Sequence, residues 1–194
     1  HLPTDQNPDL RAVLNNYPLL AFEAHSTDYQ HPGAYPQLAD MGFAIQKVGP
    51  ALTFAFRQAV YGLDVLATIL KTSGAGLLET MEVEMLAQPA HWQGHYQGNA
   101  DRLKLQRHFA YSDRIRYYWG RPAVQQSLRA LLDGLSDRAL PDPLLEQVFA
   151  REILERAERL SPSMPKTQAL VLASIQAALA PCYFSATRPK GQAL

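Results

Sequence analysis

The clearest pattern of apolar and polar positions lies in the first third of the chain. Two short apolar runs, Leu19–Ala24 and Phe43–Val48, are each followed by polar residues and then by a stretch with helical spacing. The first of these helices is short, around Tyr35–Asp40, whereas the second, Leu52–Leu70, repeats apolar residues every three or four positions. This alternation predicts two βα units with adjacent parallel strands, whose chemistry lies at the carboxyl ends of the strands.

Beyond residue 72 the sequence shows no further convincing strand and is helical in pattern. A short helix around Asp9–Asn16 also precedes the first strand. Later helices are predicted where apolar residues recur at helical spacing, in the stretches 77–85, 124–135, 145–160 and 171–178. The third of these is expected to be one continuous helix that begins at about Pro143.

Two strands make a poor sheet on their own, and a barrel of eight βα units needs roughly 250 residues. The sequence therefore predicts an α/β fold that is the C-terminal part of a TIM (β/α)8 barrel, comprising its last two βα units, followed by a helical extension. On this interpretation residues 1–72 form the barrel units, residues 73–184 form the extension packed on the barrel, and residues 185–194 form a flexible tail.

Composition excludes several classes of function. The chain has 194 residues and a formal net charge of +0, so nothing in its charge favours nucleic acid or an anionic membrane as a partner. A single cysteine excludes an internal disulfide framework and fits a reducing compartment. The first residues lack the basic and apolar segments of a signal peptide, and no apolar run is long enough to cross a bilayer. We therefore expect a cytoplasmic protein.

Four motifs carry a specific resemblance to a known family. They are FEAHSTDYQ at residues 22–30, QKVGPALTFA at 46–55, YQGN at 96–99 and YSDRIRYYW at 111–119. Together they resemble the non-catalytic, Z-type subunit of class II D-tagatose-1,6-bisphosphate aldolase, a family that also carries the older label of tagatose 6-phosphate kinase. Members of that family are full barrels, so the chain resembles their C-terminal half.

The resemblance implies an accessory subunit in galactitol, N-acetylgalactosamine and tagatose catabolism. Its partner would be a catalytic aldolase subunit, its ligand a phosphorylated ketose, and it would need no cofactor. One alternative is a zinc-dependent ketose-bisphosphate aldolase, and another is a sugar-phosphate kinase. The kinase interpretation lacks a Walker-type loop, because residues 71–76, KTSGAG, have the wrong order and follow a helix.

A weaker resemblance to the catalytic class II aldolases gives candidate site residues. It places His25 at a zinc-ligand position, Ser26 and Thr27 at two glycines of a phosphate loop, and Lys47 at the start of a second motif. A hydrogen-bonded loop histidine is the alternative for His25, because a catalytic zinc needs about three protein ligands. The candidate vestigial sugar-phosphate site comprises Glu23, His25, Ser26, Thr27, Asp28, Lys47 and Gly49.

The phosphate loop is degenerate on chemical grounds. Ser26 and Thr27 could still donate hydroxyl hydrogen bonds, but Asp28 would repel a phosphate and Pro50 has no N–H to donate. Lys47 could attract a phosphate as a point charge. We favour instead an ion pair with Glu23 inside the barrel, since a buried lysine requires a partner.

A second candidate surface lies in the segment rich in arginine and aromatic residues. Arg114, Arg116, Tyr117 and Trp119 are of the types that dominate protein interfaces. They form our candidate surface for the aldolase partner. The alternative is a helix that its aromatic side chains anchor on the barrel.

Overall fold

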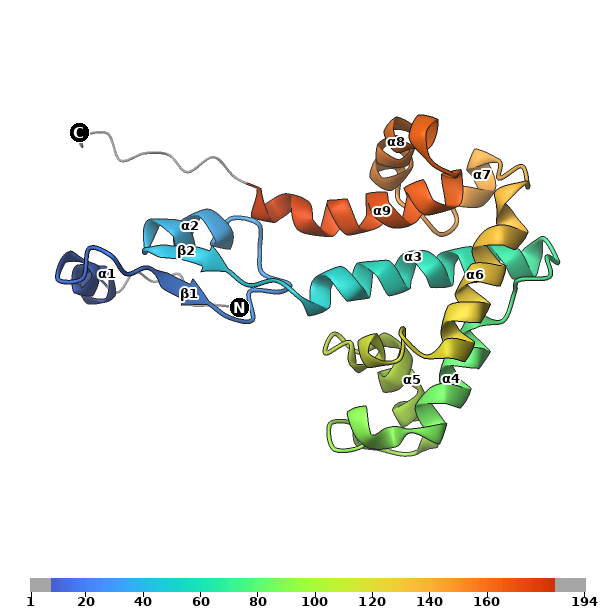
Figure 1. Ribbon diagram of the computed structural model, residues 1–194, viewed down its shortest axis with the longest axis horizontal. Coiled ribbons are helices and arrows are strands. Elements are labelled where there is room, and N and C mark those ends of the chain that lie inside the picture. The colour runs from blue at the N-terminus through green and yellow to red at the C-terminus, as the bar shows by residue number, and fades with distance from the viewer. Residues whose placement is uncertain (1–7, 184–194) are drawn as a thin grey trace. The chain divides into compact units, whose positions relative to one another are not determined.

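The computed structural model describes residues 8–183 as a mixed α/β structure that is mostly helical and has a small parallel sheet (Figure 1). Two compact units are present, one of His1–Gly49 with Leu179–Leu194 and one of Pro50–Ala178, called here the first and second units. The expected division after residue 72 stays a prediction, and the expected tail, residues 185–194, lies outside the described residues.

The sheet of the first unit pairs strand β1 (Phe22–Ala24) with strand β2 (Phe43–Gln46). The strands are parallel, with Glu23 opposite Ile45, so the predicted parallel pair is confirmed. Both strands are shorter than the apolar runs that predicted them. The first run begins in a turn, closed by a hydrogen bond from the Leu20 N–H to the Tyr17 carbonyl, which leaves Leu19 98% exposed.

Helix α2 (Ala34–Asp40) packs on β2 and lies beside it in Figure 1. It buries Tyr35 and Leu38, and the turn that follows it contains Gly42, whose positive φ of +97° suits glycine. Helix α1 (Pro8–Asn15) precedes the sheet, and a 3-10 turn, η4 (Ala180–Cys182), also belongs to this unit.

The second unit is helical, and its core contains the apolar faces that the sequence predicted. Leu63, Leu77, Leu131 and Leu145 are all fully buried. In the last helix the buried residues are instead Leu170 and its neighbours Ala169 and Ala173, while the expected Val171 is only half-buried. The helices are α3 (Pro50–Ile69), α4 (Leu77–Ala87), α5 (Ala100–Phe109), α6 (Pro122–Ser136), α7 (Asp142–Leu145), α8 (Arg151–Leu160) and α9 (Lys166–Leu179). The 3-10 turns η1 (Pro89–His91), η2 (Arg114–Tyr117) and η3 (Ser161–Ser163) connect them.

The prediction of one continuous helix from Pro143 to Leu160 is wrong. Ala150 has extended dihedral angles, φ −65° and ψ 149°, and starts α8 as a separate helix. The break lets the side chains of both Val148 and Phe149 approach Gly62 of α3. Apolar spacing alone could not reveal this break, because Leu145, Phe149 and Ile153 keep a helical period across it.

Two contacts hold α4 and α6 in place within this unit. The Asp64 carboxylate of α3 accepts hydrogen bonds of 2.8, 3.1 and 3.0 Å from the N–H groups of Gly76, Leu77 and Leu78, so it caps α4 from a neighbouring helix. Gly74 meets α6 so closely that an added Cβ would lie 2.2 Å from the Ala130 carbonyl oxygen. The glycine-rich residues 71–76 thus serve packing in this structure.

Candidate functional site

The loops that follow β1 and β2 are hydrogen-bonded to each other. The Lys47 N–H donates to the Ala24 carbonyl at 2.9 Å. Thr27 donates twice to the Lys47 carbonyl, from its N–H at 3.4 Å and from its hydroxyl at 2.9 Å, and it is completely buried. The Thr27 hydroxyl, expected as a donor to a ligand, is therefore used inside the protein.

Asp28 provides the next link between the loops. Its Oδ1 atom accepts a hydrogen bond of 2.9 Å from the Gly49 N–H. Glycine N–H groups beside the carboxyl end of a strand can approach an anion closely, and here the anion is a side chain of the protein. The sequence predicted that Asp28 would repel a phosphate, and the structure shows which donor its carboxylate occupies.

The loop after β1 contains two strained backbone positions, and a buried tyrosine holds it in place. Ser26 and Tyr29 have positive φ angles of 58° and 59°, which residues other than glycine rarely adopt. The Tyr35 hydroxyl donates to the Thr27 carbonyl at 3.0 Å, and the Gln46 side chain donates to the Tyr35 carbonyl at 2.9 Å. Burial raises the pKa of Tyr35, as do nearby Cys182 and Asp28, so its hydroxyl remains a donor. Ser26 itself is exposed.

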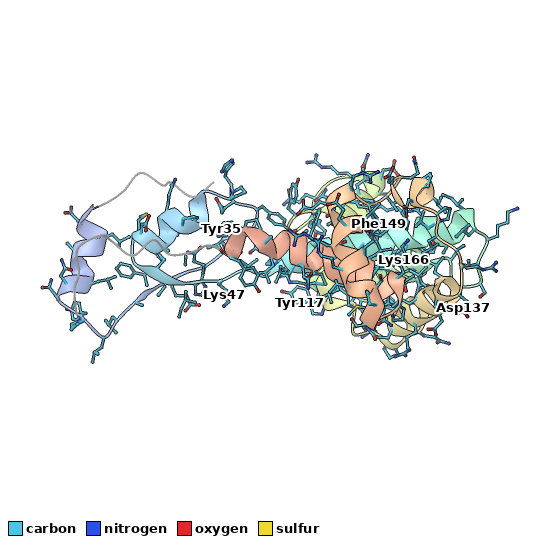
Figure 2. All side chains as sticks on the ribbon, turned by 90° about the horizontal axis from the view of Figure 1, so that it is seen from above. Tyr35, Lys47, Tyr117, Asp137, Phe149 and Lys166 are labelled. Carbon is cyan, nitrogen blue, oxygen red and sulfur yellow. The ribbon has the colours of Figure 1, made fainter. Side chains whose placement is uncertain are left out.

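Three charged or titratable side chains are exposed near the ends of the strands. His25 Nε2 lies 3.2 Å from Glu23 Oε1, and their side chains are 62% and 45% exposed. Lys47 is also exposed, and Figure 2 shows it on the other side of the strands from Tyr35. The expected ion pair between Glu23 and Lys47 is wrong, because Glu23 instead pairs with His25. An exposed lysine keeps its hydration and needs no partner.

A zinc ion would find too few ligands in this part of the protein. Glu23 and His25 offer one oxygen and one nitrogen donor, whereas a catalytic zinc takes about three protein ligands. Within residues 8–183 no group of three His, Cys, Asp or Glu side chains is placed to hold a metal ion. The residues described here therefore do not form a complete zinc site.

The candidate interface residues separate into two environments. The Arg114 and Arg116 guanidinium carbons lie 5.1 and 4.4 Å from the centroid of the Tyr117 ring, and Tyr117, labelled in Figure 2, is 45% exposed. Trp119 instead packs edge-on against Phe56 with 4.9 Å between ring centroids, and it is 9% exposed. Trp119 is thus a core residue of the second unit in this structure, while the other three form an accessible cluster.

Sequence reasoning missed a buried polar network in the second unit. Tyr61 Oη lies 2.7 Å from His108 Nδ1, His108 Nε2 lies 3.0 Å from Glu82 Oε2, and Arg107 Nε donates to the same oxygen at 2.9 Å. Tyr61, Arg107 and His108 are all buried. The signal in the sequence is the polar pair Arg107-His108 on a helix with few apolar residues.

The directions in which the pKa values shift indicate which atoms of this network carry protons. Burial lowers the pKa of His108, and burial raises the pKa of Tyr61. Burial alone would raise the pKa of Glu82, but hydrogen bonds and charge from Arg107, with help from His108, leave it lowered. A neutral His108 therefore donates from Nε2 to the Glu82 carboxylate and accepts at Nδ1 from the Tyr61 hydroxyl. Every member is satisfied, so the network serves the stability of the core.

A second buried contact joins α3 to the segment before η2. Asp113 accepts hydrogen bonds from the Thr53 hydroxyl at 2.5 Å and from Arg57 Nε at 3.3 Å, and Arg57 and Asp113 are 2% and 1% exposed. The Arg57 guanidinium lies 4.1 Å above the Phe54 ring. Like the histidine network, this ion pair is enclosed by the protein.

The molecule is thus a mixed α/β protein with a polar site at the carboxyl ends of two parallel strands. Residues 2–188 match the family described as D-tagatose-1,6-bisphosphate aldolase subunit GatZ/KbaZ-like, and the chain belongs to this family. The family expected from the sequence motifs is confirmed. Across residues 8–183, no helix has both the length and the apolar character needed to span a bilayer.

Two relatives extend the comparison. The chain is 50% identical over 140 residues to a D-tagatose 6-phosphate 4-epimerase of Agrobacterium fabrum, an alignment that covers 71% of this chain and 33% of the relative. It also resembles the crystal structure of a probable tagatose 6 phosphate kinase from Sinorhizobium meliloti 1021, with 41% identity and a TM-score of 0.79. That match covers 90% of this chain and 45% of the solved chain. The chain therefore spans less than half the length of either relative.

Proposed function

We propose that the chain is the carboxy-terminal part of an accessory, cytoplasmic subunit of class II D-tagatose-1,6-bisphosphate aldolase. In this proposal β1 and β2, with the helices that follow them, are the last two βα units of a (β/α)8 barrel, and the later helices are an extension. The subunit stabilises a catalytic partner and cleaves no sugar itself. The family match and the parallel pairing of β1 and β2 support this proposal.

The observation that carries the non-catalytic part is the closed pair of loops. Cleavage of a ketose bisphosphate requires donors that hold both phosphates while the carbon–carbon bond breaks. The Gly49 N–H binds Asp28, the Thr27 hydroxyl binds the Lys47 carbonyl, and Pro50 has no N–H. A bisphosphate would have to displace an ionised side chain of the protein to reach this position.

The partner surface we propose is the cluster of Arg114, Arg116 and Tyr117. The Arg116 guanidinium lies over the ring of Tyr117, and its side chain also donates a hydrogen bond of 2.8 Å to the Tyr117 hydroxyl. A preorganised arginine and tyrosine lose little side-chain entropy on binding. Trp119 takes no part in this surface, because its side chain is buried in the core of the second unit.

The test is the thermal inactivation of a catalytic class II tagatose-bisphosphate aldolase with and without this chain. The proposal expects a longer half-life with the chain, because a partner that binds the native state stabilises it. Arg116→Ala should weaken the protection, and Arg129→Ala, which removes an exposed arginine of α6, should not. A half-life unchanged at saturating concentration rejects the accessory role.

A second candidate function is C4 epimerisation of a tagatose phosphate. The relative named as an epimerase supports it, as do the exposed Glu23–His25 pair and Lys47, since a carboxylate–imidazole pair can move protons. Zinc bound in part through His25 belongs to this alternative, with its other ligands outside the described residues. Incubation with D-tagatose 6-phosphate should then yield D-fructose 6-phosphate. Formation of that product, abolished in Glu23→Gln, would favour the epimerase over the accessory role.

A further inference from the structure

Three donors beside β1 and β2, the Gly49 N–H and the N–H and hydroxyl of Thr27, are already paired within the first unit, whereas Ser26 and Lys47 are exposed. Backbone N–H groups at the carboxyl ends of parallel strands commonly bind an anionic ligand. Here Asp28 Oδ1 lies 2.9 Å from the Gly49 nitrogen, at the distance that a phosphate oxygen would take. The N–H and hydroxyl of Thr27 both donate to the Lys47 carbonyl, so they do not face a ligand either.

The position of Asp28 is held by more than this one contact. The Gln30 side chain donates to the Asp28 carbonyl at 3.3 Å, and the Tyr35 hydroxyl holds the preceding carbonyl, that of Thr27, at 3.0 Å. Positive φ angles at Ser26 and Tyr29, on either side, turn the backbone so that the carboxylate meets Gly49. These hydrogen bonds fix the backbone from which the Asp28 side chain extends, and the hydrogen bond from the Gly49 N–H then positions the carboxylate itself.

We propose that Asp28 determines specificity by occupying the place of a phosphate. The ends of β1 and β2 then accept the unphosphorylated end of a ketose monophosphate and reject a ketose bisphosphate. This inference rests on the proposed function in tagatose-phosphate metabolism. It assigns the hydroxyl-bearing end of the sugar to these loops, because a carboxylate accepts hydrogen bonds from hydroxyl groups and repels a phosphate.

The first experiment compares two ligands on the unmodified chain by isothermal titration calorimetry. D-tagatose 6-phosphate should bind on the order of 100-fold more tightly than D-tagatose 1,6-bisphosphate, since the juxtaposition of like charges carries a penalty of that size. Equal or tighter binding of the bisphosphate overturns the inference. If neither sugar binds, the proposed ligand class is wrong, and the second experiment decides the role of Asp28 by itself.

The second experiment uses inorganic phosphate as the probe and the Gly49 amide as the reporter. The chain is labelled with ¹⁵N-glycine and phosphate is added to the wild type, to Asp28→Ser and to Asp28→Gly. The Gly49 signal should move and saturate in either variant and stay in place in the wild type. Asp40→Ser, which removes an exposed carboxylate of α2 in the same unit, should behave as the wild type.

Two outcomes of that titration overturn the inference. One is a Gly49 signal that moves as far in the wild type as in the variants. The other is a signal that stays in place in a variant whose remaining glycine signals match those of the folded wild type. The two substitutions differ in loop flexibility, so loss of the fold in one of them leaves the other to decide.

Discussion

Replacement of Gly74 by alanine should destabilise the second unit strongly. The added Cβ would lie 2.2 Å from the Ala130 carbonyl oxygen, 2.6 Å from its carbonyl carbon and 2.7 Å from the Leu131 Cα, all backbone atoms of α6. Ordinary contact begins at about 3.4 Å, so the loop or the helix must move. Gly134 faces Gly74 from α6, and a Cβ at that position would already lie 3.4 Å from the Gly74 nitrogen.

The size of the effect follows from this lack of room. Overpacking of a core usually costs about 1–3 kcal/mol, and the upper end applies because backbone, rather than a flexible side chain, is in the way. For a domain of this size, about 3 kcal/mol lowers the midpoint of thermal unfolding by about 10 °C. Circular dichroism at a helical wavelength measures this midpoint directly.

Gly94→Ala is the matched control, because no atom lies within 4 Å of its added Cβ. Its midpoint should stay within about 2 °C of the wild type, or rise slightly as the unfolded chain loses freedom. Equal midpoints of thermal unfolding for Gly74→Ala and Gly94→Ala would refute the conclusion that residues 71–76 pack closely on α6.

Two further predictions concern buried polar groups of the second unit. Burial holds the pKa of His108 below its usual value near 6.5. As the pH falls, His108 is therefore protonated in the unfolded chain before it is protonated in the folded chain, so stability should fall as the pH drops below about 6.5. Urea unfolding at neutral and mildly acidic pH should show a smaller pH dependence in His108→Gln, and an unchanged one in His95→Gln, which alters an exposed histidine. Asp64→Ala should cost about 3 kcal/mol, because three N–H groups at the start of α4 lose their acceptor, while Asp137→Ala at an exposed position should cost almost nothing. Similar urea midpoints for these two variants would exclude the capping role of Asp64.

The sequence predicted elements well where one apolar face decides the structure. Helices α3 and α6 follow their leucine spacing, and β1 and β2 are parallel as the βα alternation required. Helix α5 escaped prediction because it buries Arg107 and His108, so its burial depends on a charged partner from α4 that no local pattern reveals.

The meeting of the two loops after the strands could be predicted from the sequence, but the contacts of their side chains could not. The segments after both strands do meet, as parallel pairing requires, but the partner of each polar side chain depends on tertiary geometry. Asp28 binds Gly49, and Glu23 binds His25 rather than Lys47. Trp119 shows the same limit, because an aromatic residue suits a core and an interface equally well until its neighbours are known.

The network of Tyr61, Glu82, Arg107 and His108 has a consequence for how this core can evolve. Each polar atom in it is acceptable only because another member satisfies it, so a single substitution leaves a buried group unpaired. The loss of two partners together can cost less than the sum of the separate losses. In homologous chains these four positions should therefore change as a set, and intermediate combinations should be rare.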